Sequence, residues 1–468
     1  MPLGLYISVP FCRTKCSYCN FASDVFSESA YENYVSRLIE DIASSHEVAA
    51  KMGCMFEPTA DSIYLGGGTP SILDGAQLLR IFTAVRDHFA VASDAEITVE
   101  CAPGTLTPAL IETLLQCGAN RVSLGVQSFV DREAQAVGRL HKRATVLEEI
   151  GRLREAGLDN TNIDLIAGLP HQTAESWAFS VSETIATGVP HASVYMLEVD
   201  DDSRLGRELM AGGARYHAHF VPDDDAIADF YQQACDMLAV GGIAQYEISN
   251  FARVTPKLRD GSLQSNQSQH NLKYWTRQPY LGFGVDAHSM LPANCENGEH
   301  CDAVRFSTPD SLEAFMNRAP RTVTPVSAQA AIEESFFLGL RLNRGIDLKQ
   351  LRKQFSAALT GTLEFMPNSD EQQVLRFAHD DNSLLDTGLL SASRSSSSSL
   401  QARPSNAILR DAVLTWETAI EQCVQQELLE QHGSNLCLTA RGRLLSNEVF
   451  ARFLVEETKV GTAHVNPR

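Results

Sequence analysis

Short runs of β-branched and aromatic residues alternate with amphipathic segments over roughly the first 200 residues, as strands and helices do in βα repeats. Six runs predict β-strands: 5–9, 62–66, 96–100, 121–126, 162–167 and 192–197. Because helical segments separate them, these strands are expected to be parallel. Six parallel strands are enough for a partial (β/α)6 barrel of the TIM type, and a doubly wound open sheet is the competing arrangement.

The segments between the runs have the period of amphipathic helices. The segment 31–45 places its apolar residues on one face, and Ser29 before it is the expected N-cap. Segments 107–118 and 144–157 predict two further helices, each ended by a glycine. A longer amphipathic helix is expected over 224–242.

Unusual residues follow five successive strands of this expected sheet. They are the cysteines after the first strand, glycines 66–68 after the second, Glu100 and Gln127 at the ends of the third and fourth, and Asp164 in the fifth. In either arrangement the carboxyl ends of parallel strands form the edge where ligands bind. The convergence of these residues favours the barrel and predicts one site at that edge.

The chain is expected to consist of four parts. A barrel core (1–215) is followed by an extension and junction (216–355), a serine-rich insertion (356–408) and a C-terminal helical domain (409–468) with a short hairpin. The insertion ends in "SASRSSSSSLQARPSN", which has too little apolar surface to order itself, so disorder is expected there. The fold class is therefore α/β with a smaller α+β or helical C-terminal domain.

Composition and charge exclude several classes of function. The net charge of −20 and the 44% hydrophobic content describe a globular acidic protein, and no nucleic-acid partner is expected. No apolar run reaches the roughly 18 residues of a membrane span, and the amino-terminal residues do not resemble a signal peptide. Eleven cysteines lack the regular spacing of a disulfide framework, so a reducing cytoplasm is expected.

The stretch "YISVPFCRTKCSYCNF" brings Cys12, Cys16 and Cys19 together just after the first strand. Zinc would need a fourth ligand, a disulfide would leave an odd thiol, and unrelated core cysteines would not gather in one loop. An iron–sulfur cubane with three thiolate ligands keeps one iron open. That iron can bind a small molecule through an amine and a carboxylate, so this pattern favours a cluster.

"CRTKCSYC" resembles the CxxxCxxC signature of radical S-adenosylmethionine (SAM) enzymes. With "YLGGGTPS" and "NIDLIAGLP", the chain is similar to the branch that contains oxygen-independent coproporphyrinogen III dehydrogenases and HemW-type haem chaperones. The resemblance covers nearly the whole chain except the serine-rich insertion. It implies a radical SAM barrel, with Cys12, Cys16 and Cys19 as ligands of a [4Fe–4S] cluster and SAM at the open iron.

The resemblance also implies the residues that would bind SAM or haem. Glycines let carbonyl groups approach the SAM amino group closely, a carboxylate suits ribose hydroxyls, and arginine suits a carboxylate. The expected cofactor-binding residues are Tyr6, Tyr18, Gly66, Gly67, Gly68, Thr69, Glu100, Gln127, Arg139, Asp164 and His270.

Two features separate the branches. The dehydrogenases resemble CxxxCxxCxC, but here Phe21 stands at the place of the fourth cysteine. They also have a long extension before the barrel, whereas five residues precede Tyr6. "HNLKYW", from His270 to Trp275, matches the HNxxYW motif of the HemW-type branch, which is linked there to haem. An imidazole suits haem iron, and Tyr274 and Trp275 would offer flat faces to a porphyrin.

Several positions qualify the haem assignment. His141 and His288 are rival ligands to His270, and the motif could instead close the active site or pack the domain junction. Three places depart from the family pattern: Ser8 stands where histidine is usual, Ala102 where asparagine is usual, and Val285–Asp286 where a Pro–Gly pair is usual. If the usual histidine positions substrate or haem, this chain, with Ser8 in its place, would do so differently or more weakly.

The resemblance therefore implies a haem chaperone that hands haem to an apoprotein, such as a respiratory enzyme, in the cytoplasm or at the inner face of the membrane. It is compatible with a homodimer. The alternative is a radical SAM oxidoreductase acting on a porphyrin or porphyrinogen, which would need a flavodoxin or ferredoxin as electron donor. Whether SAM is cleaved is left open, and a third alternative is another molecule in the substrate pocket.

Overall fold

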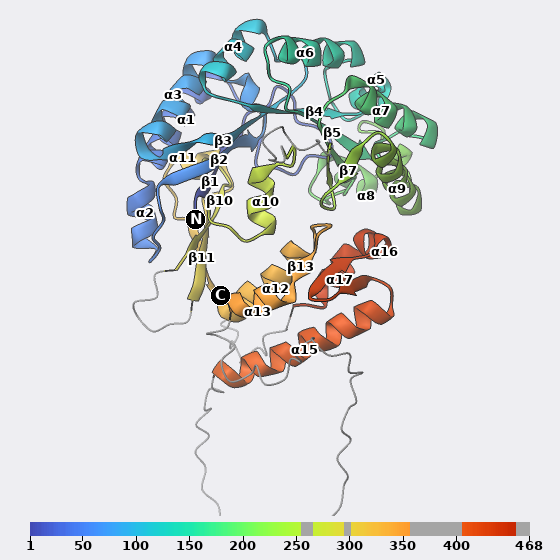
Figure 1. Cartoon of the computed structure of the whole chain (residues 1–468). Helices are drawn as coiled ribbons and strands as arrows, with labels where there is room; N and C mark the ends of the chain where they lie inside the picture. Colours follow the sequence, from blue (N-terminus) through green and yellow to red (C-terminus); the bar gives the residue numbers. More distant parts are fainter. Residues whose placement is uncertain (254–264, 294–300, 356–404, 455–468) are drawn as a thin grey trace, which may run out of the picture.

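The computed structural model describes residues 1–253, 265–293, 301–355 and 405–454 (Figure 1). Within these residues the main sheet has twelve strands, in the order β12-β11-β10-β9-β1-β2-β3-β4-β5-β6-β8-β7. Most of the predicted serine-rich insertion, residues 356–404, lies outside the described residues. The division of the chain into four parts therefore stays a prediction.

All six predicted strands are present, adjacent and parallel. They are β1 Leu3–Val9, β2 Thr59–Gly67, β3 Ala90–Cys101, β4 Arg121–Gln127, β5 Thr161–Ala167 and β6 His191–Met196. Figure 1 shows the helices of these repeats as an outer layer around the curved sheet, which confirms the partial barrel. They are α1 Glu28–Ala43, α2 Ser45–Lys51, α3 Gly75–His88, α4 Pro108–Gln116, α5 Asp131–Ala136, α6 Arg143–Glu155, α7 Ala174–Thr187, α8 Arg204–Ala211 and α9 Asp224–Val240.

Local sequence explains where these helices begin and end. The expected apolar face of α1 is buried at Tyr34, Val35, Leu38 and Ile42. Ser29 is not its cap, because α1 begins at Glu28 and places that serine in the first turn. The helices α4 and α6 end before glycines at positive φ, 81° at residue 118 and 83° at residue 157, which only glycine adopts without strain.

Later segments extend both edges of the barrel. β9 (Tyr280–Phe283) pairs with β1 in parallel, and β10 (His288–Pro292), β11 (Cys301–Ser307) and β12 (Thr322–Ser327) follow as antiparallel strands. At the other edge, β8 (Asn250–Arg253) and β7 (Ile243–Gln245) add to β6. The short helix α10 (Gln269–Trp275) lies on the inner side of the sheet, opposite the outer helices (Figure 1).

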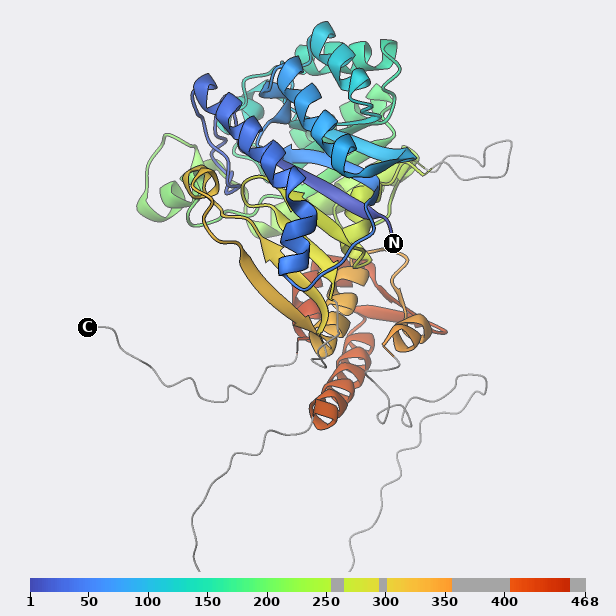
Figure 2. The same cartoon turned by 90° about the vertical axis from the view of Figure 1, so that its left-hand side faces the viewer.

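The C-terminal part has its own core on one side of the barrel (Figure 2). In it Trp416 donates its indole N–H to the Phe453 carbonyl at 3.0 Å, and the Phe336 ring stacks on the Phe453 ring. Its elements are α12 Ala328–Gly339, β13 Ile346–Asp347, α13 Leu348–Gln354, α15 Ser405–Gln425, β14 Leu429–His432, β15 Asn435–Leu438, α16 Ala440–Leu444 and α17 Ser446–Ala451. The pair β14–β15 is the predicted hairpin. Among the described residues, no helix is long and apolar enough to cross a membrane.

Candidate functional site

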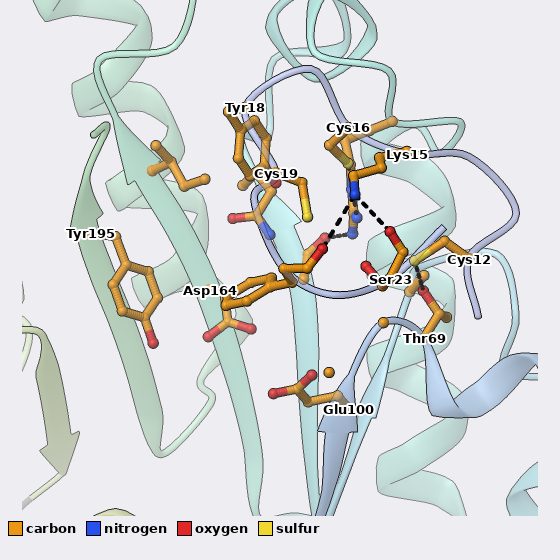
Figure 3. A pocket seen from close by; sticks show the side chains of 18 of the residues that line it. Cys12, Lys15, Cys16, Tyr18, Cys19, Ser23, Thr69, Glu100, Asp164 and Tyr195 are labelled. Carbon is orange, nitrogen blue, oxygen red and sulfur yellow. Dashed lines mark hydrogen bonds between the residues drawn. The ribbon is translucent and has the colours of Figure 1, made fainter. Parts of the chain in front are cut away.

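A cavity of about 350 Å³ opens at the carboxyl ends of the parallel strands (Figure 3). The structure brings most of the predicted site residues to this cavity, which we call the cluster cavity. They are Cys12, Cys16, Tyr18, Cys19, Gly67, Gly68, Thr69, Glu100, Gln127, Arg139 and Asp164. Three predicted residues, Tyr6, Gly66 and His270, are not among those lining it.

The three cysteines lie on the loop that follows β1, residues 10–24. At the base of the loop, the Cys12 amide donates a hydrogen bond to the Asp24 carbonyl at 3.0 Å. Inside the loop, the Lys15 ammonium donates to the Ser23 carbonyl at 2.7 Å. These bonds hold the loop in a wrapped conformation, so that its side chains face the cavity (Figure 3).

The thiols differ in exposure and in their neighbours. Cys16 is buried, whereas Cys12 and Cys19 are partly exposed. The Arg139 guanidinium donates to the sulfur of Cys16 at 3.7 Å, and the Thr69 hydroxyl donates to that of Cys12 at 3.8 Å. These two donors would hydrogen-bond the sulfur atoms of thiolate ligands in a metal-bound form.

This donor set fits a polynuclear cluster better than a single ion. In the described part of the chain, no three His, Cys, Asp or Glu side chains converge tightly enough to hold one metal ion. The thiols instead border a cavity. Burial raises the pKa of the Cys12 and Cys19 thiols, so neither is a free thiolate at neutral pH. Metal binding would deprotonate both.

The glycine run joins the end of β2 to the cysteine loop. The Gly68 amide donates to the Val9 carbonyl, and the Thr69 amide donates to the Phe11 carbonyl, both at 2.8 Å. A Cβ atom at Gly68 would lie 2.7 Å from the Phe11 carbonyl oxygen and 2.8 Å from that of Val9. Only glycine therefore fits this close approach of two backbone segments. The neighbouring Gly67 has φ 102°.

Two carboxyl groups lie deeper in the cluster cavity, below the cysteine loop in Figure 3. Glu100 accepts a hydrogen bond from the Tyr64 hydroxyl at 2.8 Å, and Asp164 accepts one from the Ser123 hydroxyl at 3.0 Å. Burial, and then the negative charge of Asp164, raise the pKa of Glu100 to about 7. Burial also raises the pKa of Asp164. The two carboxyl groups are therefore suited to a ligand that offers hydrogen-bond donors or positive charge.

Two more cavity residues retain unused hydrogen-bonding capacity. Within the described residues, the buried side-chain oxygen of Gln127 and the buried Nε of Arg139 have no partner. Gln127 also has φ 68°, a conformation that costs a non-glycine residue energy and that is frequent at functional sites. Both residues line the cluster cavity, so an unpaired acceptor and an unpaired donor at its wall are suited to a polar ligand.

Sequence reasoning missed several residues of the cluster cavity. The most informative are Tyr64, Ser123 and Tyr195, which line it from β2, β4 and β6. Tyr64 lies two residues before Gly66, and Ser123 lies four before Gln127, so the alternation of strand side chains could have identified both. Gly66 itself is buried, and a Cβ there would lie 3.0 Å from the Glu100 side chain.

A second cavity of similar volume, about 350 Å³, adjoins the first. Phe21 and Gly67 line both cavities. We call it the aromatic cavity, because four of its side chains are aromatic rings; its lining residues are Tyr6, Ser8, Phe21, Ala22, Gly67, Tyr274, Tyr280, Val285, Asp286 and His288. The predicted residue Tyr6 is therefore placed here, one cavity away from the deeper carboxyl groups.

The HNLKYW motif forms α10, with His270 buried inside the barrel. Its ring nitrogens pair with the Ser62 hydroxyl at 3.0 Å and with the Tyr274 hydroxyl at 2.8 Å. Burial lowers the pKa of His270 to about 3, so the ring is neutral. The Lys273 ammonium bonds the Pro2 carbonyl at 3.0 Å, which ties the helix to the start of β1.

Trp275 of the motif and the two rival ligands, His141 and His288, lie in different environments. Trp275 is covered by the Arg341 guanidinium, 4.3 Å from the ring centre. His141 is buried and bonded to the Val126 carbonyl at 3.1 Å. His288 is exposed at the aromatic cavity. Of the three candidate haem-binding histidines, it is therefore the accessible one.

Family models match two parts of the chain. The model of the radical SAM superfamily matches residues 6–181, and that of the HemN C-terminal domain matches residues 326–374. Among solved structures, coproporphyrinogen III oxidase (HemN) from Escherichia coli, a radical SAM enzyme, superposes with a TM-score of 0.70. The match covers 97% of this chain and 90% of that one at 20% sequence identity, so it bears on the fold alone.

Curated relatives match most of the chain. The "Heme chaperone HemW" of Lactococcus lactis is 31% identical over 76% of this chain and 86% of the relative. The protein of the same name from Synechocystis is 31% identical over 82% of this chain and 89% of the relative. That from Escherichia coli is 32% identical over 68% of this chain and 82% of the relative.

Proposed function

Because the chain belongs to the HemW-type family of the radical SAM superfamily, we propose that it is a haem chaperone that binds haem and delivers it to an apoprotein. It would carry a [4Fe–4S] cluster on three cysteines, with SAM at the open iron. The main observation in support of this proposal is the arrangement of the cysteine loop. The three thiols of this loop border one cavity with the polar strand ends, and an exposed Phe21 occupies the place of a fourth cysteine in the motif.

The residues of the cluster cavity have distinct proposed roles. Cys12, Cys16 and Cys19 would hold the cluster, which when bound supplies one-electron chemistry. Backbone carbonyls of the glycine run, residues 66–68, would receive the amino group of SAM. The unpaired Nε of Arg139 would face an anionic group such as a carboxylate.

The deeper part of the cluster cavity suits the nucleoside. Glu100 and Asp164 would accept hydrogen bonds from ribose hydroxyls, and the unpaired oxygen of Gln127 would accept another. Tyr18 lines the cavity between two of the cysteines and offers a flat face to adenine.

The raised pKa of Glu100 predicts a pH-dependent affinity for SAM. Below about pH 7 the empty cavity holds a protonated Glu100, which has to lose its proton before it accepts two ribose hydroxyls; above that pH it is already charged. If SAM binds the charged form, its affinity should rise about tenfold between pH 6 and pH 8 for a group of pKa about 7. Calorimetric titration of the cluster-loaded protein would measure this. Glu100→Gln should bind weakly and equally at both pH values, and a wild-type affinity that falls with pH would contradict the prediction.

For haem, the aromatic cavity offers a suitable surface. The rings of Tyr6, Phe21, Tyr274 and Tyr280 supply apolar faces of the kind that porphyrins stack on. His270 as a haem ligand stays a prediction, because both of its ring nitrogens are hydrogen-bonded in the interior. Ligation would require these bonds to break.

The proposal also includes the place in the cell where haem is delivered. The acidic charge and scattered cysteines suit the cytoplasm, and a membrane-bound respiratory acceptor would place delivery at the inner face of the membrane. A homodimer, and a flavodoxin or ferredoxin that reduces the cluster, are further parts of the same proposal.

Anaerobic titration of the cluster-loaded protein with haem tests the proposed function. We expect a saturable shift of the Soret band with a dissociation constant in the micromolar range or below, about −8 kcal/mol. Incubation with coproporphyrinogen III, SAM and a reductant should give no decarboxylated product. Absence of saturable haem binding would contradict the chaperone, and formation of that product would favour the oxidoreductase instead.

A further inference from the structure

The aromatic cavity contains an accessible imidazole. Its His288 side chain has 69% relative exposure, whereas His270 and His141 have 1% and 5% exposed residue surface. Iron binding requires a ring nitrogen with a free lone pair and a path for the metal. In the described part of the chain, His288 is the one histidine that lines either cavity, and its exposed ring meets both conditions.

The backbone around His288 fixes its place at the mouth of this cavity. His288 is the first residue of β10, and its strand pairs with β11 at Ser307. The preceding turn contains Asp286 at φ 53°, held by a hydrogen bond from its amide to the Pro309 carbonyl at 2.8 Å. The imidazole is therefore attached to a bonded strand end and not to a free loop tip.

A carboxylate accompanies this imidazole. The Nε2 atom of His288 lies 3.7 Å from the Oδ1 atom of Asp286, which is an electrostatic contact longer than a hydrogen bond. A carboxylate within hydrogen-bond distance of one ring nitrogen orients a metal-binding histidine and makes it a stronger ligand, so Asp286 would have to approach the ring when haem binds. Asp286 has a left-handed φ at a position where the related motif has glycine, so the carboxylate comes from a substitution that this backbone conformation disfavours.

The other departure from the motif lies on the same cavity. Ser8, in the place of the usual histidine, lines it from β1 and is 5% exposed. The wall of the cavity thus lacks an imidazole at residue 8, while its mouth has one at His288 with a carboxylate beside it. Ser8 and Asp286 therefore both change which side chains at the aromatic cavity could bind a metal.

We propose that the porphyrin of haem docks in the aromatic cavity and that His288, oriented by Asp286, supplies the axial nitrogen to its iron. The inference rests on the proposed haem chaperone and specifies its haem site. The rings of Tyr274 and Tyr280 contact the porphyrin face, and Phe21 separates it from the cluster cavity. The propionates remain in solvent, because the charged side chain that shares the mouth with His288 is the acidic Asp286.

The test compares His288→Ala with His432→Ala in the full-length, cluster-loaded protein. His432 is a matched control, because it is 71% exposed and lies 3.4 Å from the carboxylate of Glu430 on the distant strand β14. We expect His288→Ala to weaken haem binding at least tenfold and to change the electron paramagnetic resonance spectrum of the bound ferric iron. Added imidazole should restore that spectrum. His432→Ala should match the wild type.

Asp286→Asn provides a second measurement that leaves His288 in place. Removing the carboxylate should weaken haem binding by about tenfold or more, the usual effect of losing such a partner. Thermal unfolding and iron content should stay at wild-type values in all three variants, since the three side chains are exposed.

The outcomes separate the two proposals. If the wild type binds no haem, the proposed function fails. If the wild type binds haem and His288→Ala keeps both its affinity and its spectrum, the haem site inferred here is wrong and the chaperone stands. Equal losses in His288→Ala and His432→Ala would indicate non-specific surface binding and would also overturn the site.

Discussion

Replacing Cys12, Cys16 and Cys19 together with serine is expected to lower the iron content of anaerobically reconstituted protein from about four irons per chain to background. The three thiols are those that line the cluster cavity from the loop of residues 10–24. Serine keeps the size of each side chain but is a poor ligand for the soft iron–sulfur cluster. Iron and acid-labile sulfide assays, with the absorption near 400 nm, measure the effect.

The variant should also lose SAM binding, because the open iron is absent. Cys235→Ser is the matched control, since Cys235 is partly exposed like Cys12 and Cys19 but lies on α9. It should retain the full complement of iron. Unchanged iron in the triple variant would refute the cluster site altogether, and loss of iron in the control would show that reconstitution depends on thiols elsewhere.

Gly68→Ala should weaken SAM binding at least tenfold and lower the free energy of unfolding by about 1–3 kcal/mol, as overpacking does. The added methyl group would lie within 2.8 Å of two carbonyl oxygens, those of Phe11 and Val9. Both belong to the backbone and cannot rotate away. The segment that carries Gly67 and Thr69 would have to move from the cysteine loop, which separates the glycine carbonyls from the cluster.

Gly151→Ala is the control for this substitution. Gly151 lies in α6, and a Cβ there meets no atom within 4 Å. The control should be neutral or more stable by up to about 1 kcal/mol, since alanine favours a helix. Denaturant unfolding and SAM titration of both variants measure the difference. A Gly68→Ala protein with wild-type stability and affinity would show that the close approach has no function.

Strand order and most of the cluster cavity could be predicted because both depend on local pattern. β-branched runs such as 121–126 and 162–167 form buried parallel strands. Because these strands run in the same direction, their carboxyl ends lie at one edge of the sheet. Glu100, Gln127 and Asp164 therefore share a cavity, as expected. The expected cap Ser29 is wrong by two residues, because the N-cap is Ser27 and because cap residues and first-turn residues have similar preferences.

The aromatic cavity could not be predicted, because it depends on contacts between distant segments. Tyr6 and Ser8 meet Tyr280 and Asp286 only when β9 pairs with β1. Periodicity within a single run carries no information about such a pairing. For the same reason the HNLKYW motif predicted His270 as a candidate haem ligand without indicating that contact with Ser62 places it inside the barrel.

The pairing of β1 with β9 also orders events during synthesis. One edge of β1 is covered by residues 280–283, where Gly4 is registered with Tyr280 and Ile7 with Phe283. On the ribosome, where a chain emerges from its amino terminus, that edge stays open until those residues appear. The cysteine loop, which follows β1, is therefore made before the strand that pairs with this edge of β1. Loading of the proposed cluster is therefore expected to follow synthesis of β9.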